Sequence, residues 1–221
     1  MEGNTINILY IDEEKDQLAD FQADAELSDL FNKIYLLEPN TNLDDMVAEI
    51  LELKVDAIIS DFALNESAVI SYNGEQLLNA IQKIRHNFPC FLRTSHEDDA
   101  ILNSFDVNRI YVKEDSLEHN SERNLFKKVA DQVSAYNRRF EAVKQEHTEL
   151  KSKLSKNGLS SQETDRLIEL DDMLESLLSA ENKTPTEVKK LALNKFDELM
   201  SSTDKLIDEI ETNLGVSSSN V

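Results

Sequence analysis

The sequence predicts an α/β domain with a five-stranded parallel sheet, followed by an all-helical extension. Two observations predict this. Up to about residue 120, short apolar runs alternate with amphipathic segments in the order βαβαβαβαβ, which is typical of a parallel sheet covered by helices on both faces. Beyond that point apolar residues recur at helical spacing, and the whole chain of 221 residues has only four Gly and three Pro to interrupt helices.

The five strands are predicted where short apolar runs end at polar residues. They cover residues 6–11, 34–37, 55–60, 90–92 and 110–112. The third run contains Ala57, Ile58 and Ile59, which make it apolar on both faces, as a central parallel strand requires. Helices are predicted between the strands, over 16–28, from Thr41 or Asn42 to Leu51, from Gly74 to Ile84, and around 100–105.

The second half predicts three helices. From Val129 to Leu154 apolar residues follow the a/d spacing of a coiled coil, and His147 falls on the same seam. Gly158 suits a left-handed helix end, a capping box over residues 160–163 opens a second helix, and residues 184–187 open a third. Because the second helix is about half as long as the first, we expect exposed seam near Tyr136 and Phe140. This favours a homodimer through the C-terminal helices, with an intrachain bundle as the alternative.

Charge and composition exclude several classes of partner. The net charge is −21, and residues 1–120 carry 8 basic against 25 acidic side chains. No basic face for nucleic acid is expected. No apolar run approaches the roughly 20 residues that span a membrane. The single Cys90 allows no intrachain disulfide, and no signal peptide is evident, so we expect a cytoplasmic protein.

Chemically active side chains follow four of the predicted strands. Asp12 and Glu13 follow the first strand, and Asp61 follows the third. Thr94 and Lys113 come at the ends of the fourth and fifth. Because open α/β sheets bind ligands at the carboxyl ends of their strands, we expect these residues to meet at one edge.

Five segments together resemble a known family. They are Ile8–Glu13, Ile58–Asp61, Gly74–Leu78 leading to Ile84 and Arg85, Pro89–Ser95, and Tyr111–Lys113. In this order and spacing they resemble the receiver domain of two-component response regulators, of the chemotaxis-regulator type. The resemblance implies a flavodoxin-like (βα)5 fold with strand order 2-1-3-4-5 for residues 1–122, and residues 123–221 form the helical extension.

The resemblance also implies a chemistry. Asp61 would accept a phosphoryl group from a sensor histidine kinase or phosphotransfer protein. Mg²⁺ would be held by Asp12, Glu13, Asp61 and the backbone carbonyl of Ala63, while Thr94 and Lys113 contact the phosphoryl oxygens. The only enzymatic activity would be this self-phosphoryl transfer and slow autodephosphorylation. No helix-turn-helix pattern follows, so no DNA-binding output is expected.

The sequence departs from the family pattern at several positions. They are Glu13, where Asp is commoner; Asn65, where Pro is usual; the long loop 66–73; Glu114, where Pro usually follows the Lys; and Ile110, where an aromatic residue often lies, here moved to Tyr111. Two alternatives therefore stay open. One is a pseudo-receiver scaffold that carries no phosphate and binds through its coiled coil. The other is a phosphotransfer protein that uses His147.

Overall fold

The computed structural model describes residues 5–65, 69–95, 101–102, 107–113, 120–178 and 184–193, together with residues 195, 202 and 205. The chain divides into two compact units. The first comprises Met1–Glu141 with Ser176–Glu181, and the second comprises Ala142–Glu175 with Asn182–Val221. These units are defined by contacts within the chain and do not test the boundary between receiver and helical extension expected after residue 122. That boundary stays a prediction.

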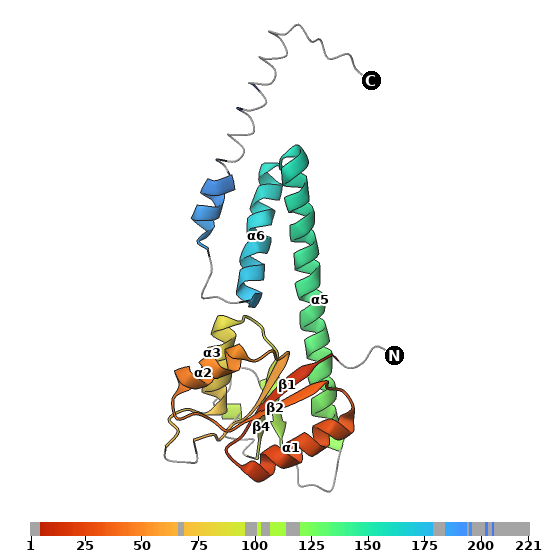
Figure 1. Ribbon diagram of the computed structural model, residues 1–221, viewed down its shortest axis with the longest axis vertical. Coiled ribbons are helices and arrows are strands. Elements are labelled where there is room, and N and C mark those ends of the chain that lie inside the picture. The colour runs from red at the N-terminus through yellow and green to blue at the C-terminus, as the bar shows by residue number, and fades with distance from the viewer. Residues whose placement is uncertain are drawn as a thin grey trace. The chain divides into compact units, whose positions relative to one another are not determined.

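The first unit contains the predicted parallel sheet. Its strands are β1 (Asn7–Ile11), β2 (Lys33–Leu37), β3 (Ala57–Asp61), β4 (Cys90–Thr94) and β5 (Ile110–Val112). They pair in the order β2-β1-β3-β4-β5, and every pair is parallel. Figure 1 labels β1, β2 and β4 of this sheet. The fold class predicted from the sequence is thus confirmed. Strand β3 reaches one residue further than expected, so that Asp61 itself is part of the sheet.

Helices connect the strands as predicted. They are α1 (Lys15–Ser28), α2 (Leu43–Glu52) and α3 (Gly74–Ile84), and a 3₁₀ turn over Val107–Arg109 precedes β5. Asn42 caps α2 through its side chain, and Asn73 forms a capping box with Gln76 at the start of α3. Of the helix expected around 100–105, residues 101 and 102 are helical and the others lie outside the described residues.

The two faces of the sheet carry separate apolar clusters, because successive strand residues point to opposite sides. One cluster combines Leu9, Ile11 and Ile58 with side chains of α2 and α3. The other combines Ile8, Tyr10 and Ile59 with α1 and with the first turns of α5 (Asn120–Asn157). Val129 and Val133, assigned from their spacing to a coiled-coil seam, are instead buried in this second cluster. The same spacing serves a helix that packs on a sheet.

Tyr136 and Phe140 are half-buried, which is less exposure than the sequence suggested. The ring of Tyr136 packs edge-on against Phe88, with 5.9 Å between centroids. Its hydroxyl donates to the backbone carbonyl of Leu177 at 2.9 Å. Residues at the end of α6 (Ser161–Leu178) therefore cover part of the seam that the sequence left for a second protomer.

The described residues of the second unit are mainly helical. Gly158 adopts the expected left-handed conformation with φ of 69°, and Ser160 and Glu163 exchange the hydrogen bonds of a capping box. Arg166 of α6 binds both carboxylate oxygens of Glu146 at 2.7 Å. Residues 186–193 are helical as predicted. Among the residues described in either unit, no helix has both the length and the apolar character needed to cross a membrane.

Candidate functional site

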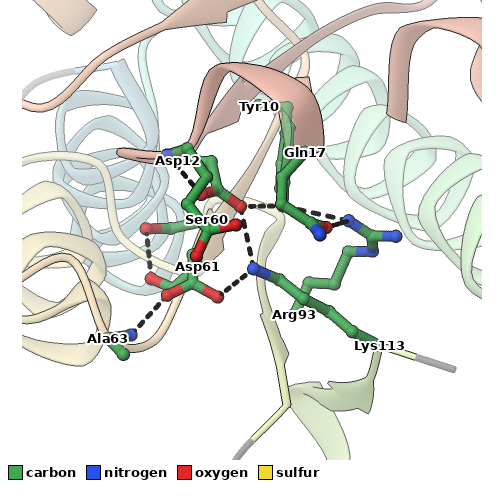
Figure 2. A network of polar contacts seen from close by, with 9 residues as sticks. Tyr10, Asp12, Gln17, Ser60, Asp61, Ala63, Arg93 and Lys113 are labelled. Atoms are coloured by element: carbon green, nitrogen blue, oxygen red, sulfur yellow. Dashed lines mark hydrogen bonds and ion pairs between the residues drawn. The ribbon is translucent and has the colours of Figure 1, made fainter. Parts of the chain in front are cut away.

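The polar strand ends converge at the carboxyl edge of the sheet, as Figure 2 shows. Asp12 directly follows β1, Asp61 ends β3, and Thr94 ends β4. The backbone N–H of Lys113 donates to the carbonyl of Thr94 at 2.7 Å, which continues the parallel ladder one residue beyond β5. The structure thus brings Asp12, Asp61 and Lys113 together, and it places the fully buried Thr94 on the adjacent strand.

The ammonium group of Lys113 bridges two buried carboxylates. Its Nζ lies 2.6 Å from Asp61 Oδ1 and 2.9 Å from Asp12 Oδ2. The three side chains are 12%, 5% and 1% exposed, so water screens these contacts little. Burial lowers the pKa of Lys113, but Asp61 and Asp12 outweigh it and raise that pKa above its ordinary value. Burial raises the pKa of Asp61, and Lys113 opposes this without cancelling it.

The second oxygen of Asp61 is held by the following loop. The backbone N–H of Ala63 donates to Asp61 Oδ2 at 2.5 Å, and Ser60 Oγ donates to the Asp61 carbonyl at 2.8 Å. Gly74 packs against the same peptide: a Cβ there would lie 1.9 Å from the Asp61 carbonyl oxygen. The position accepts no side chain, because this first residue of α3 touches the backbone that carries Asp61.

Glu13 lies beside this pair and is half-buried. Burial, reinforced by the charges of Asp61 and Asp12, raises its pKa from 4.5 to about 7. Its buried Oε2 has no hydrogen-bond partner among the residues that the structure describes. An orphaned carboxylate oxygen of this kind can be satisfied by a cation or by water.

The donor chemistry fits Mg²⁺, which prefers carboxylate and carbonyl oxygens and keeps several of its waters. The orphaned Glu13 oxygen and the neighbouring Asp12 and Asp61 carboxylates provide such donors. The fit is partial, because within the described residues no three acidic, His or Cys side chains form a ready-made metal group. Lys113 instead occupies the space between Asp12 and Asp61.

Sequence reasoning missed two residues of the site. Tyr10 of β1 donates a 2.5 Å hydrogen bond to Asp12 Oδ2, and Arg93 of β4 donates to the Tyr10 hydroxyl at 3.1 Å (Figure 2). Both side chains are buried. Arg93 could have been found as a charged residue inside an apolar strand, since a buried Arg needs polar partners. Tyr10 gave no such signal, because a strand Tyr is ordinarily part of the core.

The aromatic residue of β5, Tyr111, lies on the opposite face of the sheet from position 110, where the family pattern often has an aromatic residue. Ile110 packs with the cluster of α2 and α3, whereas the ring of Tyr111 packs on the α1 face, 6.0 Å from the Phe91 ring. Adjacent strand residues point to opposite sides, so Tyr111 does not stand in for an aromatic residue at position 110. Glu114, which takes the place of the usual Pro after Lys113, lies outside the described residues.

A cavity of about 1360 Å³ lies away from the strand-end site. It is bordered by the end of α3, the start of β4 and part of α5, and none of the five predicted strand-end residues lines it. The candidate site is therefore a cluster at the edge of the sheet, separate from this cavity.

His147 lies in the second unit. Its Nε2 is 3.2 Å from Asp171 Oδ1, and its side chain is 15% exposed. Lys189 contacts the other oxygen of Asp171 at 2.6 Å, and it also contacts Asp172 and Glu175. His147 is thus an element of a polar contact between helices.

No known family model matches the chain, and no curated protein matches its sequence. Solved structures that resemble it include a pilus assembly-related protein from Burkholderia pseudomallei K96243, at 16% identity and a TM-score of 0.43, with 60% of this chain and 94% of that chain covered. Another is the lysine decarboxylase LdcF of Francisella novicida, at 20% identity and a TM-score of 0.37, covering 60% and 18%.

A third is the constitutive lysine decarboxylase of E. coli, at 13% identity and a TM-score of 0.36, with 71% of this chain and 21% of that chain covered. The chain therefore spans about a fifth of either decarboxylase. At these values the likenesses carry no conclusion about what the chain does.

Proposed function

We propose that the α/β domain is a response-regulator-like receiver that accepts a phosphoryl group on Asp61. The observation that supports this best is the placement of Lys113. A lysine whose Nζ lies 2.6 Å from one strand-end carboxylate and 2.9 Å from another is poised to exchange a carboxylate for a phosphoryl oxygen. A protein that acts only as a binding scaffold has no physical need for this buried arrangement.

The proposed reaction is a transfer between two nucleophiles. A carboxylate oxygen of Asp61 attacks phosphorus and forms a new P–O bond, giving an acyl phosphate. The bond from phosphorus to the imidazole nitrogen of the donor phosphohistidine breaks, and its electron pair stays on that nitrogen. Lys113 then pairs with a phosphoryl oxygen, and the Thr94 hydroxyl donates to another.

Asp12, Glu13, Asp61 and the backbone carbonyl of Ala63 would hold Mg²⁺, which neutralises charge on the transferring group. Among the residues of this chain, Glu13 brings the orphaned oxygen. The ammonium of Lys113 has three N–H donors and the two carboxylates use two of them, so the third can donate to a phosphoryl oxygen.

The partners follow from the same proposal. The donor is a sensor histidine kinase or a phosphotransfer protein in the cytoplasm. The output is a contact with another protein, or the carriage of phosphate, rather than DNA binding. The helical half is proposed to form a homodimer through its C-terminal helices.

Intact-mass spectrometry tests the central step. Incubation with acetyl phosphate and Mg²⁺ should add about 80 Da, the mass of one phosphoryl group. Asp61→Asn should abolish this species. Asp56→Asn is the matched control, since Asp56 precedes the other end of β3 and accepts the N–H of Asn7 at 2.8 Å, so its loss should leave labelling unchanged. Labelling that persists in Asp61→Asn contradicts the assignment.

The two alternatives make different predictions in this assay. A pseudo-receiver scaffold stays unlabelled with acetyl phosphate and with a phosphorylated kinase alike. A phosphotransfer protein loses its label in His147→Gln rather than in Asp61→Asn. The pairing of His147 with Asp171 and its low exposure do not favour that second alternative, because a phosphoacceptor His must be open to a partner's active site.

A further inference from the structure

The hydroxyl of Tyr10 is enclosed between a carboxylate and a guanidinium. Tyr10 is fully buried, and its ring stacks on Phe21 with 4.0 Å between centroids and 16° between planes. The hydroxyl oxygen lies 2.5 Å from Asp12 Oδ2 and 3.1 Å from an Arg93 nitrogen. Figure 2 shows the three groups in a row that leads from the acidic site toward α1.

The direction of these hydrogen bonds follows from the groups themselves. A guanidinium can only donate and an ionised carboxylate can only accept, whereas a hydroxyl has one hydrogen and two lone pairs. With Arg93 donating to the Tyr10 oxygen, the single Tyr10 hydrogen must point to Asp12.

Arg93 is fixed in turn by its surroundings. Its side chain is buried, with 4% exposure, and its backbone lies opposite that of Asp61 in the register of β3 and β4. Its guanidinium lies 5.6 Å from the centroid of the Tyr10 ring, and one of its nitrogens is 3.4 Å from Gln17 Oε1 on α1. The guanidinium held in this way occupies a lone pair of the Tyr10 oxygen and so directs the Tyr10 O–H toward Asp12.

These contacts leave one side of Asp12 available. Oδ2 accepts from both Tyr10 and Lys113, which uses its two lone pairs. Oδ1 accepts from the backbone N–H of Glu14 at 3.0 Å and keeps one lone pair. While these bonds hold, a cation that approaches Asp12 reaches it through Oδ1.

We propose that Tyr10, oriented by Arg93, is a positioning residue that fixes the Asp12 carboxylate so that Oδ1 faces an incoming divalent cation. The inference rests on the proposed function, in which Asp12 is a ligand of Mg²⁺. Partners that orient a ligand carboxylate typically change metal affinity by about 10- to 100-fold when they are removed.

Calorimetric titration of the full chain with Mg²⁺ tests the proposal. Tyr10→Phe keeps the ring and should raise the Kd for Mg²⁺ by about tenfold. The Mg²⁺ concentration for half-maximal labelling by acetyl phosphate should rise by the same factor, while the labelling rate at saturating Mg²⁺ stays at the wild-type value. A merely structural defect would also lower the labelling rate at saturating Mg²⁺.

Tyr72→Phe is the matched control. Tyr72 is also buried, and its hydroxyl donates to the carbonyl of Asn40 at 2.7 Å, so the variant loses one hydrogen bond without touching Asp12. Its Kd should equal that of the wild type. Arg93→Met should weaken Mg²⁺ binding in the same direction as Tyr10→Phe but by less, since Tyr10 keeps its own bond to Asp12.

Three results would overturn the inference. Mg²⁺ binding by Tyr10→Phe that is as tight as the wild type or tighter removes the role of Tyr10, even if Asp61 is labelled normally. Mg²⁺ binding by Arg93→Met that is as tight as in the wild type shows that Arg93 does not orient Tyr10. A wild-type chain that binds no Mg²⁺ overturns both the inference and the metal site of the proposed function, so the two failures are distinguishable.

Discussion

Replacement of Lys113 by Met is expected to destabilise the first unit strongly, because it leaves two buried carboxylates without their shared cation. Lys113 Nζ lies within 2.9 Å of both Asp12 and Asp61, whose side chains are 1% and 5% exposed. Removal of one partner from a buried ion pair typically costs about 3–5 kcal/mol. Met keeps most of the apolar stem, so the loss reports the charge rather than a cavity.

A second route to the magnitude gives the same range. A carboxylate that cannot stay ionised will take up a proton instead. With an ordinary Asp pKa of 3.8, protonation of Asp61 at pH 7 costs about 4 kcal/mol, at about 1.4 kcal/mol for each pH unit. The cost per carboxylate should therefore not exceed this value.

The loss should depend on pH with a definite sign. Burial already raises the pKa of Asp61, and without Lys113 that pKa rises further. A group whose folded pKa lies above its unfolded value contributes stability below the unfolded pKa and loses it as pH rises through the folded pKa. The variant should therefore recover toward pH 5, where protonation of Asp61 costs under about 2 kcal/mol.

Urea unfolding followed by tyrosine fluorescence measures this effect. The chain has five Tyr and no Trp, and all five Tyr lie in the first unit, so the signal reports that unit alone. Lys15→Met is the control: Lys15 pairs with Glu38 at 3.3 Å, but the side chains are 77% and 56% exposed, so it should cost under about 1 kcal/mol. A Lys113→Met loss as small as that of the control, or one independent of pH, would refute the reasoning.

Three further predictions concern other residues. Burial raises the pKa of Glu13 from 4.5 to about 7, so the stability that Glu13 contributes is present below pH 4.5 and is lost by about pH 7. Glu13→Gln should therefore flatten the change in urea midpoint between pH 5 and 8. Equal changes in the variant and the wild type would contradict this role of Glu13. Gly74→Ala places a Cβ 1.9 Å from the Asp61 carbonyl oxygen and should cost about 1–3 kcal/mol and slow labelling of Asp61; wild-type stability would show that the contact relaxes freely. Light scattering of the wild type should report about twice the chain mass of 25.2 kDa, and Phe140→Asp should halve the measured mass. A wild-type chain that is monomeric at high concentration would contradict the dimer and would indicate that helices of the same chain cover the apolar seam.

The sequence by itself determined the sheet and most of the site. Apolar runs of strand length, separated by amphipathic segments, fixed which residues form β1 to β5, because hydrophobic periodicity is a local property. The parallel arrangement then followed from the βα alternation. Asp12, Asp61 and Lys113 come directly at strand ends, and the carboxyl ends of parallel strands share one edge, so their meeting was predictable without coordinates.

The tertiary structure decided what covers each apolar face and which polar groups meet across the sheet. Val129 and Val133 have a spacing that fits a coiled coil and a sheet-packing helix equally well, and only the fold assigned them to the sheet. Arg93 and Tyr10 are 83 residues apart, and their hydrogen bond depends on strand order and on the packing of α1. A local pattern specifies which side of an element is apolar, whereas the identity of the partner is set by contacts between distant segments.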